Sequence, residues 1–178
     1  MALFYPFPII QTERLILRSL MPEDTKPLFE MRTDPIHQQF IDRPIPEKER
    51  EMEEFIQKIQ HGIENDQWIY WAIQGPNESS LMGTICLWNW KKEQRTAEVG
   101  FELALRWQGN GYMQEALEAV IQYGFDQMQL TAIQAYTHAL NIKSIQLLLK
   151  KQFKLKASIE EQSHKTGKLE QINIYERL

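Results

Sequence analysis

The stretch AEVGFELALRWQGNGYMQEALEAVIQYGF, residues 97–125, carries the pattern that decides the fold. Its beginning alternates residue types as a strand does, and the part after Gly111 has apolar residues at helical spacing. Between them lies a glycine loop, Arg106-Trp107-Gln108-Gly109-Asn110-Gly111. Glycine permits positive φ and lets a ligand approach the backbone. The free N–H groups at the start of the helix favour an anion such as a phosphate, and Arg106 adds positive charge.

Taken alone, this loop is also compatible with a simple tight turn. A Walker phosphate loop does not fit, because no Gly-Lys-Ser/Thr follows. A dinucleotide fingerprint does not fit either, because its third glycine is missing and the chain has no second mononucleotide-binding half. The loop by itself therefore indicates an anion site and leaves the anion open.

The rest of the chain predicts alternating groups of strands and helices around this loop. We expect strands at residues 12–18, 68–74, 81–90, 96–103, 131–137, 155–162 and 169–175. We expect helices from about residue 21 until Asp34-Pro35, and at 47–64, 112–127 and 141–151. Turns are expected at Gly75-Pro76-Asn77 and around Gly167. This order predicts a mixed α/β sheet whose clear parallel crossover runs from residue 96 to 137, with the chemistry where that crossover leaves the sheet.

Length and composition indicate one globular domain covering residues 1–178. Hydrophobic residues make up 43% and charged residues 25%, and no apolar run reaches the roughly 20 residues that span a membrane. The N-terminal stretch lacks the basic start and cleavage site of a signal peptide, so we expect a cytoplasmic protein with no membrane partner. The net charge of −4 argues against nucleic-acid binding. The lone Cys86 permits no internal disulfide, and the four histidines have no metal-ligand spacing, so we expect no metal.

Residues 97–125 resemble the central motif of the GNAT acetyltransferases, with the Arg-x-x-Gly-x-Gly pattern inside WQGNGYM. HALNIKSIQLLLKKQF, residues 138–153, is similar to the later helix of that family. The opening TERLILR and the final strands resemble its RimJ/RimL branch, which acetylates protein N-termini and some other amines. The resemblance implies the GNAT acyl-CoA N-acyltransferase fold, with about seven mostly antiparallel strands, a central parallel crossover and about four helices.

The resemblance also implies how acetyl-CoA binds. The residues from Leu103 to Leu105 would pair their backbone with the pantetheine arm, and Asn141 would reach the same arm. Arg106 lies at the mouth of the loop. Main-chain amides would hold the pyrophosphate, and these belong to Gln108, Gly109, Asn110, Gly111, Tyr112 and Met113.

Two positions depart from the family pattern. Many relatives have a proline just before the loop, where this chain has Ala104-Leu105. Relatives usually end the later helix in Gly-Phe, whereas this chain has Gln152-Phe153. Because a glycine there often caps the helix in left-handed geometry, glutamine makes the cap costlier or changes the turn.

Acetyl transfer requires a neutral amine. Deprotonation at pH 7 costs about 1–1.5 kcal/mol for an α-amine and roughly 4–5 kcal/mol for a lysine side chain. Glu98 is the first candidate for the general base, because it aligns with the glutamate that histone-acetylating relatives use. Strand alternation places Glu98 and Glu102 on the same face, so Glu102 is a second candidate, and both are also compatible with a solvated sheet face. Ser144 matches a serine of RimL-type enzymes and is a candidate proton donor to the leaving thiolate, or an ordinary helix serine.

The alternation also places Trp88 and Trp90 on one strand face, either as packing residues or as a lining of the acceptor cleft. Cys86 has no obvious base partner, which favours direct attack over a ping-pong route. We therefore predict an N-acetyltransferase, monomeric or homodimeric, that moves an acetyl group from acetyl-CoA to a protein N-terminal α-amine. The alternatives are a small-molecule acetyltransferase, for a polyamine, antibiotic or amino-acid derivative, and a non-catalytic acyl-CoA-binding sensor.

Overall fold

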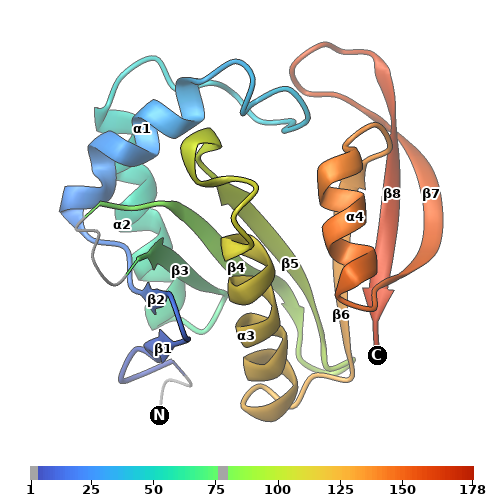
Figure 1. Cartoon of the computed structure of the whole chain (residues 1–178), viewed down its shortest axis with the longest axis horizontal. Coiled ribbons are helices and arrows are strands. Elements are labelled where there is room, and N and C mark those ends of the chain that lie inside the picture. The colour runs from blue at the N-terminus through green and yellow to red at the C-terminus, as the bar shows by residue number, and fades with distance from the viewer. Residues whose placement is uncertain (1–3, 76–79) are drawn as a thin grey trace.

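A computed structural model describes residues 4–75 and 80–178. Its eight strands form one sheet in the order β1-β2-β3-β4-β5-β6-β8-β7, in which only β5 and β6 pair in parallel (Figure 1). This confirms the mixed α/β GNAT fold. The strands are β1 (Ile10–Gln11), β2 (Ile16–Arg18), β3 (Ile69–Gln74), β4 (Gly83–Lys91), β5 (Thr96–Leu103), β6 (Ala132–His138), β7 (Lys154–Gln162) and β8 (Leu169–Arg177). The helices are α1 (Thr25–Thr33), α2 (Arg50–Glu64), α3 (Tyr112–Asp126) and α4 (Ile142–Lys150), with 3₁₀ turns at Pro22–Asp24 and Leu105–Trp107.

The first predicted strand, residues 12–18, covers the turn and the second strand, β2, of a short hairpin that begins with β1. Thr12 and Leu15 close the turn between β1 and β2, since each backbone N–H donates to an oxygen of the other residue at 3.0 Å. The extra strand β1 explains why the sheet has eight strands where about seven were predicted. The predicted turn at Gly75-Pro76-Asn77 lies outside the described residues from Pro76 onward.

The helices cover opposite faces of the sheet, with α3 and α4 on one side and α1 and α2 on the other (Figure 1). Leu87 of β4 and Ile133 of β6 point to α3, where they lie next to Gly124. Thr84 of β4 is an odd number of residues from Leu87 and points the other way, toward Glu102 and the Arg32 side chain of α1. At the end of β5, one face of the sheet is therefore directed toward α1 and α2 and the other face toward α3 and α4.

Strands β5 and β6 pair only at their beginnings. Residues 96–98 of β5 match residues 132–134 of β6, after which β6 continues alongside β8 alone. Within the described residues, the second half of β5 therefore has no partner strand on its β6 side, and Figure 1 shows the two strands diverging toward the glycine loop. This leaves that edge of β5 without a strand partner after residue 98, and at its end Leu103 O accepts instead from the Gln108 side chain.

A β-bulge in β4 changes the expected alternation of its tryptophans. Trp88 pairs with Glu98 and Lys91 with Thr96, so β4 has one extra residue, and Asn89 adopts a left-handed φ of 47°. Trp90 then packs on the core side with its ring centroid 6.0 Å from that of Phe4. Trp88 stays 48% exposed. The prediction that the two tryptophans share a face was wrong, because the bulge reverses the alternation between them.

The C-terminus of α4 keeps the left-handed cap without its usual glycine. Gln152 has φ of 63°, its N–H donates to Leu149 O, and the Phe153 N–H donates to Leu148 O, both at 3.0 Å. This is the Schellman pattern, and it buries the Phe153 ring. In the described part of the chain, no helix has the length and apolar character needed to cross a membrane.

Candidate active site

The glycine loop connects the end of β5 to α3 through backbone conformations that glycine adopts easily. Gly109 has φ of 82° and Gly111, the N-cap of α3, has φ of 79°. A Cβ built at Gly109 would meet no atom within 4 Å, so this backbone faces open space. Asn110 folds its side-chain amide back onto the carbonyls of Trp107 and Gln108. The sequence-predicted loop therefore has the geometry that exposes its main chain to a ligand.

The N–H groups at the start of α3 are available for an anion. No side chain caps this terminus, and the first helical hydrogen bond runs from Glu115 N–H to Gly111 O at 3.1 Å. The amides of Tyr112 and Met113 precede it and have no intrahelical acceptor. Gln108 differs from the rest of the loop, because its N–H already donates to Leu105 O at 3.1 Å.

Arg14 holds the loop from outside the motif. Its Nε donates to Glu115 Oε2 at 2.7 Å, its Nη1 donates to Asn110 O at 2.9 Å, and its guanidinium lies 4.8 Å from the Tyr112 ring centroid. The Thr12 hydroxyl donates to the same glutamate at 2.6 Å. Sequence reasoning missed this contact, because a separation of about a hundred residues leaves no local pattern.

Gln108 links the end of β5 to α4. Its Nε2 donates to Leu103 O at 2.9 Å, and its Oε1 accepts from Lys143 Nζ at 3.1 Å. Arg106 is exposed, and its guanidinium lies 5.4 Å from the Trp107 ring centroid. Leu105 is half-buried in the 3₁₀ turn between them. Lys143 of α4 thus lies beside the loop, a neighbour that the sequence did not predict.

Asn141 and Ser144 lie together at the start of α4. Asn141 is the N-cap, and its Oδ1 accepts the Ser144 N–H at 3.2 Å. The half-buried Ser144 hydroxyl makes no hydrogen bond to any described residue. The hydroxyl is therefore available as a donor, and the Asn141 amide nitrogen is available for a ligand.

Glu98 lies on the last rung where β5 pairs with β6. It is half-buried, stands between Trp88 and Gln134 on the neighbouring strands, and accepts one hydrogen bond, from Asn89 Nδ2 at 2.5 Å. The left-handed Asn89 of the β-bulge supplies that donor. The carboxylate therefore keeps most of its acceptor capacity.

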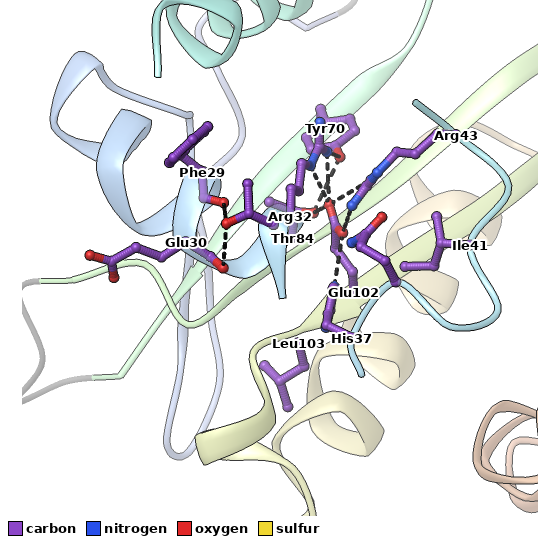
Figure 2. Close-up of polar contacts among 12 residues, drawn as sticks. Phe29, Glu30, Arg32, His37, Ile41, Arg43, Tyr70, Thr84, Glu102 and Leu103 are labelled. Atoms are coloured by element: carbon purple, nitrogen blue, oxygen red, sulfur yellow. Dashed lines mark hydrogen bonds and ion pairs between the residues drawn. The ribbon is translucent and has the colours of Figure 1, made fainter. Parts of the chain in front are cut away.

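Glu102 is in a very different environment, buried on the α1 and α2 face (Figure 2). Its Oε1 accepts from Arg32 Nε and Nη2 at 3.0 and 2.7 Å and from Thr84 Oγ1 at 3.2 Å. Its Oε2 accepts from Arg43 Nη2 at 2.5 Å and lies 3.2 Å from His37 Nε2. We call these five residues the Glu102 cluster.

The pKa values follow from these contacts. Burial alone would raise the pKa of the Glu102 carboxyl, but Arg32, Arg43 and the hydrogen bond from His37 outweigh it and hold the pKa well below its usual value. Burial raises the pKa of the Cys86 thiol to about 12. Cys86 is thus a protonated thiol at neutral pH and a poor nucleophile.

Comparison with known proteins gives the family. Residues 14–154 match the acetyltransferase (GNAT) domain. The chain is 27% identical over 169 residues to the uncharacterized N-acetyltransferase YoaA of Bacillus subtilis, covering 95% of this chain and 96% of that protein.

Solved structures share the fold. The chain superposes on RimL, a ribosomal L7/L12 alpha-N-protein acetyltransferase in complex with coenzyme A, with a TM-score of 0.86, 19% identity and coverage of 96% of this chain and 98% of that one. It also superposes on the spermidine N-acetyltransferase of Vibrio cholerae in complex with CoA and spermine, with a TM-score of 0.82, 19% identity and coverage of 94% and 96%. The chain belongs to the GNAT acetyltransferases, enzymes that use acetyl-CoA to acetylate their acceptors.

Proposed function

We propose that this acetyltransferase acts, as one catalytic domain, on a protein N-terminal α-amine by direct attack on acetyl-CoA. The observation that carries the proposal is the divergence of β5 and β6 beside an uncapped α3 N-terminus. The free edge of β5 can pair with an extended pantetheine arm, and the loop amides can receive a pyrophosphate. Named structural neighbours act on a ribosomal-protein α-amine and on spermidine, so the fold is compatible with both acceptor classes.

We assign coenzyme binding to the glycine loop, to the end of β5 and to the start of α4. Leu103 ends the free edge of β5, Leu105 follows it in the 3₁₀ turn, and Asn141 is the N-cap of α4 with an amide nitrogen available for the coenzyme. Arg106 and the amides from Gly109 to Met113 are the proposed phosphate site. The N–H of Gln108 is used within the loop, and its side chain would support the site by joining Leu103 O to Lys143.

The charge of the Glu102 cluster favours an α-amine over a polyamine. Its single carboxylate contacts the guanidinium groups of Arg32 and Arg43, so the cluster carries excess positive charge. A polyamine acceptor would bring several further positive charges to this side of the sheet, which is unfavourable in a partly buried site. An α-amine has a pKa near 8 and needs only a modest base.

Glu98 is the proposed base, acting directly or through a water. Its carboxylate has one hydrogen bond, whereas the depressed pKa of Glu102 makes that carboxylate the weaker base. Ser144 is the proposed donor to the leaving thiolate, because its hydroxyl has no partner among the described residues. The high pKa of Cys86 supports direct attack over an acetyl-cysteine intermediate.

The test is Glu98→Gln, assayed by thiol release with N-terminal peptides, spermidine and an aminoglycoside as acceptors. We expect turnover on peptides to fall about 100-fold with little change in acetyl-CoA affinity, since a general base contributes on this order. Glu161→Gln is the control, an exposed acid on β7. Unchanged turnover across the pH range would remove Glu98 as the base. Acetyl-CoA binding without turnover on any amine would instead identify a sensor.

A further inference from the structure

A second feature of the α1 and α2 face is a cavity of about 280 Å³ between α2 and the connection that precedes it. Its charged lining includes Arg32, Arg43 and Lys58, with Glu51 and Glu54 on the rim and Phe55 as an apolar wall. We call it the Lys58 cavity. It lies on the face of the sheet opposite α3, so it is separate from the coenzyme loop.

The two acids that line the Lys58 cavity each accept hydrogen bonds through one carboxylate oxygen, and none of these bonds comes from Lys58. Glu51 accepts the N–H groups of Glu47 and Lys48 at 2.8 and 2.9 Å, and Glu54 accepts from Arg50 Nε at 3.1 Å. Lys58 makes no ion pair with any residue that the structure describes. The cavity therefore keeps a free ammonium group even though two carboxylates line it.

Arg43 connects the cavity to the Glu102 cluster. Its two terminal nitrogens contact Glu102, while its Nε is buried and has no hydrogen-bond partner. A buried, unpaired donor on a charged group is costly, which favours an acceptor at this position. Arg32 is held by Glu102 and by the Phe55 ring, whose centroid lies 4.0 Å from its guanidinium carbon.

We infer that the Lys58 cavity binds a carboxylate carried by the amine acceptor, such as an acidic side chain near a protein N-terminus. An acceptor carboxylate would pair with Lys58 beside the Arg43 side chain that lines the cavity, and Phe55 would contact the methylene groups next to that carboxylate. Arg43 lines the cavity and contacts Glu102, the residue before Leu103, so one side chain separates the cavity from the strand end where the thioester is proposed to lie. The inference rests on the proposed function and assigns Arg43 and Lys58 as specificity-determining residues.

The test compares peptide pairs that differ only in Glu or Gln at the first, second or third position. For at least one pair we expect the wild type to prefer the acidic peptide about tenfold in kcat/KM, as for a charge pair at an interface. Lys58→Gln should bring that ratio close to one and leave the affinity for acetyl-CoA unchanged. Lys26→Gln, at an exposed lysine of α1, should keep the wild-type ratio.

The outcomes separate the two proposals. If no peptide is acetylated, the proposed acceptor class fails, whatever the cavity binds. If peptides are acetylated but no pair shows a preference, or Lys58→Gln keeps the preference, the cavity does not select the acceptor.

Discussion

The glycine loop and the Glu102 cluster lie on opposite faces of the same strand end, and they are built in opposite ways. The loop uses consecutive residues and presents backbone N–H groups that have no internal partner. The cluster uses side chains from α1, the following connection, β4 and β5, and its carboxylate is saturated with donors. Under the proposed function, the loop can hold a phosphate through its local backbone shape alone, whereas the proposed acceptor side depends on side chains that are distant in the sequence.

The two regions also differ in what stabilises them. The loop keeps unsatisfied donors, which is tolerable because they face open space. The Glu102 carboxylate is buried, where a charge requires partners on every side. We therefore expect substitutions in the cluster to act on folding and substitutions in the loop to act on binding.

The largest expected effect comes from Glu102→Gln, which leaves the buried Arg32 guanidinium and the half-buried Arg43 guanidinium without their carboxylate. Breaking a buried ion pair costs about 3–5 kcal/mol, so urea denaturation at pH 7 should show a loss of this size in the free energy of unfolding. Glu98→Gln is the matched control on the same strand face and should change stability by less than about 1 kcal/mol. Equal losses of unfolding free energy in Glu102→Gln and Glu98→Gln would show that the Glu102 cluster has no special role in stability.

The same comparison has a pH dependence with a defined sign. Because the folded pKa of Glu102 is lowered, its stabilisation is complete above the unfolded pKa, about 4.3, and is lost as the pH falls through the folded value. The difference in unfolding free energy between wild type and Glu102→Gln should therefore shrink below about pH 4.3. A difference that is constant with pH would show that Glu102 is not the titrating group.

An effect of intermediate size is expected for Gly109→Ala, which tests whether the glycine loop binds acetyl-CoA. Gly109 and Gly167 both have positive φ, 82° and 67°, and a Cβ added to either glycine would meet no atom within 4 Å. Both alanine variants should lose about 1–2 kcal/mol of stability from backbone strain. Only Gly109→Ala should weaken acetyl-CoA binding in titration calorimetry, by about 10–100-fold, since a shift of 1–3 kcal/mol at the phosphate site has this effect. Equal acetyl-CoA affinities for the two variants would show that the loop does not bind the coenzyme.

The contrast also explains what the sequence could predict. The strand, the glycine loop and the helix between residues 97 and 126 follow from local periodicity and backbone preference, and the structure confirms them. The roles of Arg14, Arg43 and Lys143 depend on contacts across long separations, for which one sequence has no pattern. The bulge at Asn89 was missed for a different reason, because strict alternation assumes that no residue is inserted.

The smallest expected effect is at the end of α4. A residue there, outside both regions, measures how much free energy a left-handed conformation costs a residue other than glycine. Gln152 adopts the left-handed conformation with φ of 63°, and it does so in a cap that buries Phe153. Gln152→Gly should remove strain and raise the unfolding free energy by about 1 kcal/mol, or Tm by about 2–4 °C, with acetyl-CoA affinity unchanged. Gln146→Gly, at an exposed position within the same helix, should instead lower stability by about 1 kcal/mol, because glycine is unfavourable inside a helix. A loss of stability in Gln152→Gly would contradict the prediction, because it would mean that the left-handed conformation costs less free energy than the glutamine side chain contributes. The strain energy expected for Gly109→Ala would then also have to be lowered.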